Sequence, residues 1–314
     1  MKEIGGYIEF EYYHGKMLHE GALPLNCGRN CLAYLFKSRN IKKLKVPFFI
    51  CNSVINVCDR YGVEKIYYHI SSDFRPVKDL RLADNEWLYL VNLYGQVSNE
   101  EVREYVKKYK RVIVDQANDY FAEPLPNVDT FYTCRKWFGV ADGAFLYTNK
   151  ELEEDLPIDE SFDRMEFLMG RFERTASEFY SEYNANNKYF MDQPVKQMSK
   201  LTSNLLRGID YENVKNIRAE NFNYLNKRLG NLNKLKLKQA TFMYPFMIDN
   251  GDVVRKKLQE QKIYIPTLWP AVFEVTEEKD LEYRMAKDIL PLPIDQRYGK
   301  EDMEYIVSQL LEVL

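Results

Sequence analysis

The chain contains little of what marks several large classes of protein. It has only three histidines, and its 44 lysines and arginines are outnumbered by 47 aspartates and glutamates, which gives a formal net charge of -3. A surface without a general excess of positive charge is a poor match for nucleic acid, so we expect no nucleic-acid partner. No apolar run reaches the roughly 18 residues needed to span a bilayer, so we expect no membrane partner.

Glycine (14) and proline (12) are both modest, which argues against low-complexity linkers. The five cysteines are an odd number in a chain of 314 residues, and this does not suit a disulfide scaffold. Residues 1–7 lack the basic and then apolar pattern of a secretion signal. We therefore expect a reducing, cytoplasmic location.

Apolar segments of strand length alternate with amphipathic helical segments in the first half of the chain. The predicted strands cover residues 45–50, 65–69, 87–93 and 111–114. Ser98 and Glu101 have the spacing of a capping box, which favours a helix that begins there. This alternation is typical of an α/β protein whose mainly parallel central sheet is covered by helices on both faces.

The pattern changes after residue 152, where charged helical segments cover residues 165–188 and 211–229. The second segment is long enough to connect two lobes. A strand at 240–248, a helix at 252–261, a short strand at 263–266 and a closing helix at 301–314 outline a smaller α/β lobe. We predict a large domain over residues 1–209 and a small C-terminal domain over residues 210–314.

The strand at residues 111–114 is followed at once by an acidic residue, Asp115. This order places a carboxylate at the carboxyl end of a central strand, where open α/β sheets bind ligands. Aspartates at strand ends also cap the next helix or turn, and the pattern alone leaves both roles open.

A second segment places Arg135 and Lys136 between apolar residues, before a reversal bracketed by Gly139 and Gly143. We expect this setting to bury Lys136 partly, which disfavours the charged form and increases the fraction of nucleophilic amine. The alternative is a lysine that lays its stem along the surface and keeps its ammonium group in water.

The third segment, residues 26–30, opens a predicted helix with Gly28, Arg29 and Asn30. Backbone N–H groups at a helix start attract anions, and Arg29 adds positive charge. The segment has neither P-loop nor GxGxxG spacing, and by itself it is most often an ordinary helix start. Together, however, the three segments supply an anion cradle, a strand-end carboxylate and an amine, which is what pyridoxal phosphate requires of a protein.

The order of these segments resembles the DegT/DnrJ/EryC1/StrS sugar aminotransferases, a family of fold-type-I pyridoxal phosphate enzymes. The resemblance runs from about residue 22 to the end and is strongest between residues 111 and 148. The motifs that carry it are Gly28-Arg29, Asp115-Gln-Ala-Asn118, Arg135-Lys136, Asp142-Gly143 and the C-terminal stretches 263–270 and 290–298. It implies the fold-type-I transferase architecture, with a smaller C-terminal lobe.

The resemblance also implies residue roles. Lys136 would form a Schiff base with pyridoxal 5'-phosphate and move a proton, and Asp115 would keep the ring nitrogen protonated. The other implied cofactor-binding residues are Gly28, Arg29, Asn30, Cys51, Asn118 and Thr133, of which Gly28, Arg29 and Thr133 would hold the phosphate. Cys51 stands where the family usually places an aromatic residue against the ring, so Phe49 or Tyr94 are alternatives for stacking.

The activity implied is that of a homodimeric transaminase that moves an amino group from an amino acid donor to a keto-sugar, free or nucleotide-linked, as in amino sugar biosynthesis. The family's Asn-x-Arg pattern for contact with the neighbouring subunit is missing, and Arg135 directly precedes Lys136. Two alternatives therefore stay open: an aminotransferase for a small non-sugar carbonyl compound, and a catalytically idle aminotransferase fold with a regulatory or scaffold role.

Other chemistries have weaker support. His14, His19, Cys27 and Cys31 lack the usual spacing of zinc ligands, so we expect no metal site. A serine hydrolase is disfavoured because the chain has no Gly-x-Ser-x-Gly elbow.

Overall fold

A computed structural model describes residues 4–314 and is organised around a seven-stranded sheet. The strand order is β1-β7-β6-β5-β4-β2-β3. Neighbours from β3 to β6 are parallel, whereas β7 is antiparallel to both β6 and β1. The strands are β1 (Leu23–Leu25), β2 (Lys43–Pro47), β3 (Glu64–Tyr68), β4 (Trp87–Val91), β5 (Val112–Asp115), β6 (Asp129–Thr133) and β7 (Ala144–Tyr147). The predicted α/β class with a mainly parallel sheet is confirmed.

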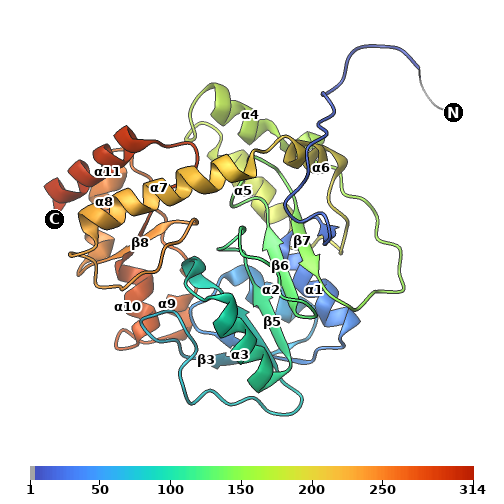
Figure 1. Ribbon diagram of the computed structural model, residues 1–314, viewed down its shortest axis with the longest axis horizontal. Helices are drawn as coiled ribbons and strands as arrows, with labels where there is room; N and C mark the ends of the chain where they lie inside the picture. The colour runs from blue at the N-terminus through green and yellow to red at the C-terminus, as the bar shows by residue number, and fades with distance from the viewer. Residues whose placement is uncertain (1–3) are drawn as a thin grey trace.

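Helices cover both faces of this sheet, as Figure 1 shows. Helix α1 (Gly28–Ser38) packs against β6, β7 and α2 (Asn52–Arg60) behind the sheet, and α3 (Asn99–Tyr109) packs against β5 in front of it. The capping box predicted at Ser98 and Glu101 is present at the start of α3. The connections therefore leave the carboxyl ends of β4, β5 and β6 at one edge of the sheet, as parallel strands require.

The middle of the chain is helical. It forms α4 (Glu166–Glu173), α5 (Tyr180–Tyr189), α6 (Lys200–Arg207) and α7 (Tyr211–Leu229), after the short 3-10 helix η2 (Phe162–Arg164). The helix expected over residues 165–188 is interrupted after Glu173, where the Thr175 hydroxyl donates to the Glu178 carboxylate at 2.8 Å. Such local side-chain bonds compete with helix continuation. The bounds predicted for α7 are confirmed.

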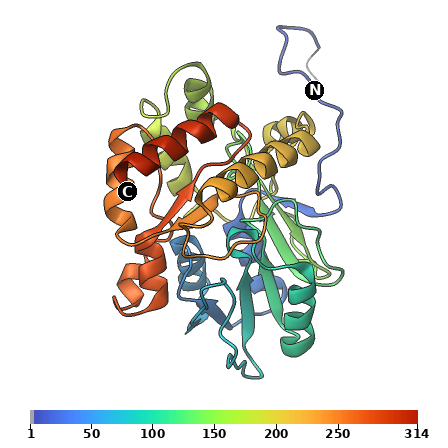
Figure 2. The same cartoon turned by 60° about the vertical axis from the view of Figure 1, so that its left-hand side comes forward.

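A second, two-stranded sheet pairs β8 (Tyr244–Met247) with β9 (Ile289–Leu292) in antiparallel fashion. Around it lie α7, α8 (Gly251–Glu260), α9 (Val272–Val275), α10 (Leu281–Asp288) and α11 (Lys300–Val313), and Figure 2 shows α7 running from the large sheet toward this smaller one. The expected strand at 263–266 is wrong, because the N–H of Ile263 is used by the carbonyl of Leu258 at 2.9 Å where α8 ends.

Two hydrophobic cores underlie the two sheets, and α7 contributes to both. Tyr211 and Val214 belong to the first core, and Phe222 and Leu225 belong to the second. The first core also includes residues beyond α7, such as Trp269. The domain boundary at residue 210 therefore stays a prediction.

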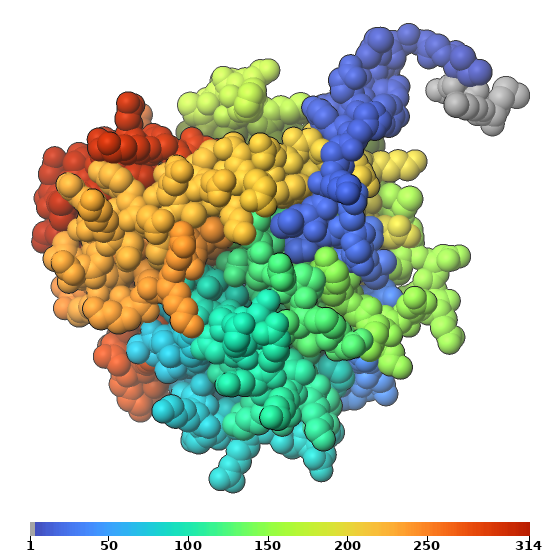
Figure 3. Space-filling view, viewed as in Figure 1, coloured from blue at the N-terminus to red at the C-terminus, as the bar shows by residue number. Residues whose placement is uncertain are grey.

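The surface has one extended feature. Residues 4–10 run away from the body of the molecule in Figure 3, and the side chains of Ile4, Tyr7 and Ile8 in this segment are exposed. Among residues 4–314, no helix combines the length and the apolarity that crossing a membrane requires.

Candidate functional site

Asp115 is the last residue of β5 and is buried. Its Oδ2 accepts a hydrogen bond from the Tyr89 hydroxyl at 2.6 Å, and its Oδ1 accepts one from the Ala117 N–H at 2.7 Å. Burial raises the pKa of Asp115, although the nearby Lys136 ammonium and these two hydrogen bonds act in the opposite direction. The bond to Ala117 makes Asp115 a turn cap, and its role in ligand binding stays a prediction.

Lys136 lies in the turn that follows β6. Its neighbours Trp137 and Phe138 are buried, whereas the Lys136 side chain is exposed and its Nζ lies 5.5 Å from the centre of the Phe242 ring. The expected partial burial of Lys136 is therefore wrong. The turn places Trp137 in the core and leaves the preceding lysine outside, which the order of residue types does not reveal.

The sheet brings the acid and the amine together. Strands β5 and β6 are parallel neighbours, with Asp115 paired to Phe131, so their carboxyl ends meet at one edge of the sheet. The turn with Lys136 leaves β6 at that edge, and the charge of Lys136 acts on the Asp115 carboxylate. A carboxylate and a primary amine from two consecutive strand ends thus lie near each other at one edge of the sheet.

The start of α1 lies against the end of β6. The N-cap residue Cys27 makes no side-chain cap, so it leaves the helix start without the usual acceptor. A Cβ atom on Gly28 would lie 3.4 Å from the Phe131 ring and 4.0 Å from Cβ of Thr133, which shows how closely the two elements approach. The structure therefore groups Gly28 and Thr133, as predicted for a phosphate cradle.

Positive charge gathers beside this helix start. The Nε of Arg29 is buried without a hydrogen-bond partner. The Arg135 guanidinium donates to Asn187 and lies 4.5 Å from the centre of the Phe190 ring. Burial lowers the pKa of Arg135, and the nearby Arg29 charge lowers it further. Within residues 4–314, neither arginine forms an ion pair with a carboxylate, so the place is suited to an anionic ligand.

Asn30 is buried but its amide is used inside the protein. Its Nδ2 donates to Oδ1 of Asn26 and to the carbonyl of Pro194, both at 2.7 Å. The side chain therefore braces the helix start from within, and the structure does not gather its amide with Gly28 and Thr133.

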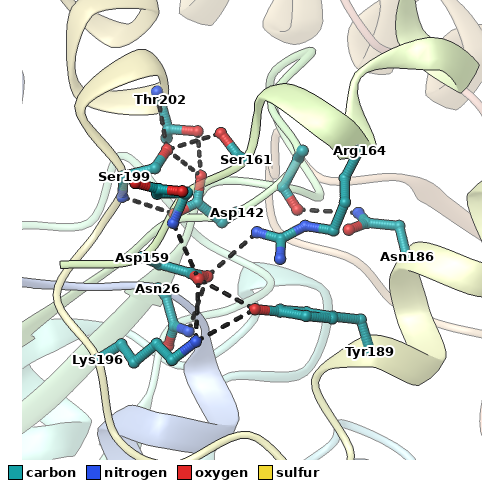
Figure 4. Close-up of polar contacts among 12 residues, drawn as sticks. Asn26, Asp142, Asp159, Ser161, Arg164, Asn186, Tyr189, Lys196, Ser199 and Thr202 are labelled. Carbon is teal, nitrogen blue, oxygen red and sulfur yellow. Dashed lines mark hydrogen bonds and ion pairs between the residues drawn. The ribbon is translucent and has the colours of Figure 1, made fainter. Parts of the chain in front are cut away.

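A buried polar network fixes the segment before α1 (Figure 4). Nδ2 of Asn26 donates to Asp159 at 3.1 Å, and Asp159 also accepts hydrogen bonds from Arg164 at 3.1 Å, Tyr189 at 3.1 Å and Lys196 at 3.4 Å. A polar cavity of about 350 Å³ opens beside it, and its lining consists of Ile158, Asp159, Glu160, Phe162, Asp163, Arg164, Tyr189 and Lys196. None of the predicted site residues lines this cavity.

Asp142 joins the same region from the other side. It accepts hydrogen bonds from the N–H of Ser199 at 2.7 Å, from the Ser199 hydroxyl at 2.7 Å and from the Thr202 hydroxyl. The N–H of the next residue, Gly143, donates to the carbonyl of Asn26 at 2.6 Å. This chain of contacts links α6 to the segment that precedes α1.

Cys51 and Asn118 lie in short connections near the sheet edge. Cys51 is partly exposed and caps α2, where its Sγ accepts from the N–H of Ser53 at 3.4 Å. Oδ1 of Asn118 accepts from the N–H of Tyr94 at 3.4 Å, and Tyr94 has a φ of 52°, which is uncommon for a residue with a side chain. Asn118 thus helps to hold a strained turn beside the site.

The rings of Phe49 and Tyr94, the alternatives for stacking, are both buried. Their centroids lie 4.6 Å and 5.7 Å from that of Trp269. Both rings therefore pack against Trp269 in the core. The partly exposed Cys51 is left as the candidate for the place beside the cofactor ring.

Two functional candidates were missed in the sequence. Tyr89 is one, and its signal is a polar hydroxyl in the otherwise apolar strand β4, which needs a partner when buried. Arg218 is the other, a charge within the buried stripe of α7. It donates to the carbonyls of Thr241 at 2.9 Å and Trp137 at 3.3 Å, and burial lowers its pKa to about 10. Arg218 therefore ties the small lobe to the turn that carries Lys136.

The weak zinc alternative has no geometric support. Nε2 of His19 lies 2.9 Å from the carbonyl oxygen of Tyr120, and its Nδ1 lies 3.2 Å from the Tyr147 hydroxyl. In the part of the chain that the structure describes, no three His, Cys, Asp or Glu side chains are grouped as metal ligands.

The fold is similar to that of solved aminotransferases. A DegT/DnrJ/EryC1/StrS aminotransferase from Brucella abortus is 14% identical, with a TM-score of 0.62 over 93% of this chain and 86% of that one. Sugar aminotransferase CalS13 from Micromonospora echinospora is 13% identical, with a TM-score of 0.64 over 93% and 87% of the two chains. NtdA from Bacillus subtilis, solved with bound cofactor PMP, is 12% identical, with a TM-score of 0.65 over 93% and 73%.

No family model and no curated protein sequence matches the chain. At these identities the structural similarity shows the fold, and the expected fold-type-I transferase architecture is confirmed.

Proposed function

We propose that the protein is a pyridoxal phosphate-dependent aminotransferase that moves an amino group from an amino acid to a keto-sugar. The observation that carries the proposal is the meeting of Asp115 and Lys136 at the ends of two neighbouring parallel strands. The fold is that of aminotransferases, and one of the similar structures is named as a sugar aminotransferase. The keto-sugar acceptor in this proposal comes from the similarity to that sugar aminotransferase.

The residues present fit the cofactor. Its phosphate is a dianion, and the start of α1 is the positive end of a helix dipole without a side-chain cap. A buried Arg29 Nε without a partner and the nearby charge of Arg135 add to it. Thr133 adds a hydroxyl beside Gly28. An anion at this place would compensate charge that the protein itself leaves unpaired.

When bound, pyridoxal phosphate supplies an aldehyde carbon and a ring that accepts electrons. Lys136 would provide the amine that attaches to that carbon, and its Nζ would carry a proton to and from the substrate carbon. The Asp115 carboxylate would keep a proton on the ring nitrogen. Asn118 would offer an amide, and Cys51 a small side chain, to the ring.

We propose that the active form is a homodimer. The exposed apolar side chains on and near α4 and α5 support a second copy at this face, and they are Phe162, Met169, Phe172, Tyr180 and Tyr183. All five cysteines are unpaired, in keeping with the reducing, cytoplasmic location that we expect. Sedimentation of the purified protein tests the dimer.

Cofactor attachment is the direct test of the proposed activity. Purified protein incubated with pyridoxal phosphate should turn yellow, and borohydride should fix the cofactor covalently. The Lys136→Ala variant should lose the covalent product, whereas a variant of the exposed Lys188 on α5, Lys188→Ala, should keep it. A wild-type protein that takes up no cofactor would contradict the proposal.

Activity separates the remaining alternatives. Transfer to keto-sugars or nucleotide keto-sugars, with release of a keto acid from the donor, supports the proposed acceptor. Transfer only to small keto compounds favours the non-sugar aminotransferase. Cofactor binding without release of keto acid from any donor favours the idle fold with a regulatory or scaffold role.

A further inference from the structure

Tyr89 reaches Asp115 from the neighbouring strand. It is completely buried in β4, and the strand register pairs Tyr89 with Ile113 and Val91 with Asp115. The long side chain therefore spans two residues along the sheet to bring its hydroxyl 2.6 Å from Oδ2 of Asp115. Burial raises the pKa of Tyr89 well above its usual range, so the hydroxyl keeps its proton and donates it in the hydrogen bond.

The two hydrogen bonds to Asp115 fix the orientation of its carboxylate. One donor, the Ala117 N–H, is backbone and follows from the local turn, whereas the Tyr89 hydroxyl is the side-chain donor. An ionised carboxylate has about four acceptor positions, so each oxygen still has capacity for a further donor. Neither bond comes from a cation, which leaves the negative charge available to a ligand.

We propose that Tyr89 is a positioning residue that orients the Asp115 carboxylate toward the ring nitrogen of the cofactor. This inference rests on the proposed function, and it adds a residue that acts on the cofactor only through Asp115. Hydrogen bonds to a charged group are among the stronger ones, so the loss of this donor should be measurable in cofactor affinity.

The edge strand β3, which is separated from β4 by β2, offers a matched control. Tyr68 on β3 is also buried, and its hydroxyl donates to the backbone carbonyl of Tyr89 at 2.9 Å. Tyr68→Phe and Tyr89→Phe each remove one buried hydroxyl and one hydrogen bond from the same core. Only the second removes a donor from Asp115.

The experiment compares two ligands. One is pyridoxal phosphate, and the other is its carbocyclic analogue, in which carbon replaces the ring nitrogen. Tyr89→Phe should raise the dissociation constant of pyridoxal phosphate by about tenfold, as expected for one hydrogen bond to a charged group. The same substitution should leave affinity for the analogue unchanged, and Tyr68→Phe should change neither.

A double-mutant cycle adds an independent readout. In an Asp115→Asn background, the additional Tyr89→Phe change should have little further effect on affinity for pyridoxal phosphate, because the two residues act as a unit. Thermal unfolding of each variant shows whether it is folded, and the cycle uses only folded variants.

The failures are distinguishable. Equal loss of affinity for both ligands, or none for pyridoxal phosphate, would contradict the role of Tyr89 while leaving the proposed function in place. Tighter binding by Tyr89→Phe would mean that the hydroxyl competes with the cofactor for Asp115, and it would also overturn the inference. A wild-type protein that binds no pyridoxal phosphate would overturn the proposed function and this inference together.

Discussion

The molecule buries two aspartates in opposite ways. Asp159 accepts hydrogen bonds from Arg164 and Lys196 as well as from neutral groups, and its side chain is 1% exposed. Asp115 is buried with neutral donors only. Although burial opposes it, the Asn26 hydrogen bond and the two cations lower the pKa of Asp159, whereas burial prevails at Asp115 and raises its pKa.

The difference separates a structural carboxylate, Asp159, from Asp115, which we propose to be functional. The charge of Asp159 is matched inside the protein, so its contacts stabilise the fold and leave little for a ligand. The charge of Asp115 lacks a cation bonded to it, which costs stability and leaves the carboxylate free to interact with a positively charged group. The unpaired Arg29 and Arg135 are the cationic counterpart of Asp115.

The largest effect is expected from breaking the matched network. Asp159→Asn leaves Arg164 and Lys196 without their anion and should lower the free energy of unfolding by about 3 kcal/mol, as for other buried pairs with one partner removed. Denaturant unfolding measures it. Asp163→Asn changes an exposed carboxylate beside the same cavity and should shift stability by less than about 0.5 kcal/mol. Equal stability of Asp159→Asn and wild type would refute the contrast.

Asp115→Asn should reduce activity strongly and stability little, the reverse of Asp159→Asn. We expect the rate of amino transfer to fall by about 100-fold or more, because a preorganised charge opposite the reacting ring is lost. The free energy of unfolding should stay within about 1 kcal/mol of wild type, since the substitution removes a charge that burial disfavours. Single-turnover kinetics and denaturant unfolding measure the two quantities. A large loss of stability without a loss of rate would assign Asp115 to the structural class.

The two carboxylates should also respond oppositely to pH. The pKa of Asp115 is raised from 3.8, so the folded state holds this proton more tightly, and stability falls as pH rises above 3.8. The pKa of Asp159 is lowered from 3.8, so its stabilisation is present above 3.8 and is lost as pH falls below it. Unfolding of wild type, Asp115→Asn and Asp159→Asn across this range measures both contributions. Parallel profiles for the two variants would contradict the assignment.

Much of the fold was predictable because it depends on local periodicity. The apolar strands, the capping box at Ser98 and the extent of α7 follow from patterns within a few residues. The place of Asp115 follows from its strand, since the carboxyl ends of parallel strands lie at one edge.

The missed features of the candidate site depend on tertiary packing. The Asn30 amide donates to the carbonyl of Pro194, and the Tyr89 hydroxyl donates to Asp115 on another strand. The exposure of Lys136 depends on which residue of its turn the core accepts, and Trp137 takes that place. A sequence pattern shows which residue types a site contains, but tertiary packing decides which atoms remain available.

The smallest expected effect extends the contrast to a half-buried carboxylate. Glu101 on α3 accepts hydrogen bonds from Arg75 at 2.6 Å, from the N–H of Ser98 at 2.8 Å and from Lys238 at 3.1 Å. Burial opposes ionisation, yet Arg75, Ser98 and Lys238 together hold the pKa of Glu101 well below its usual range.

Glu101 is therefore paired with cations, as Asp159 is, but the Glu101 side chain is 27% exposed, so water screens the charges. Glu101→Gln should lower the free energy of unfolding by only about 1 kcal/mol, the size of a lost helix cap with a partly screened ion pair. High salt should reduce the difference from wild type, whereas the loss in Asp159→Asn should persist, because buried pairs are screened less. A loss in Glu101→Gln as large and as insensitive to salt as that in Asp159→Asn would show that burial does not set the strength of these networks.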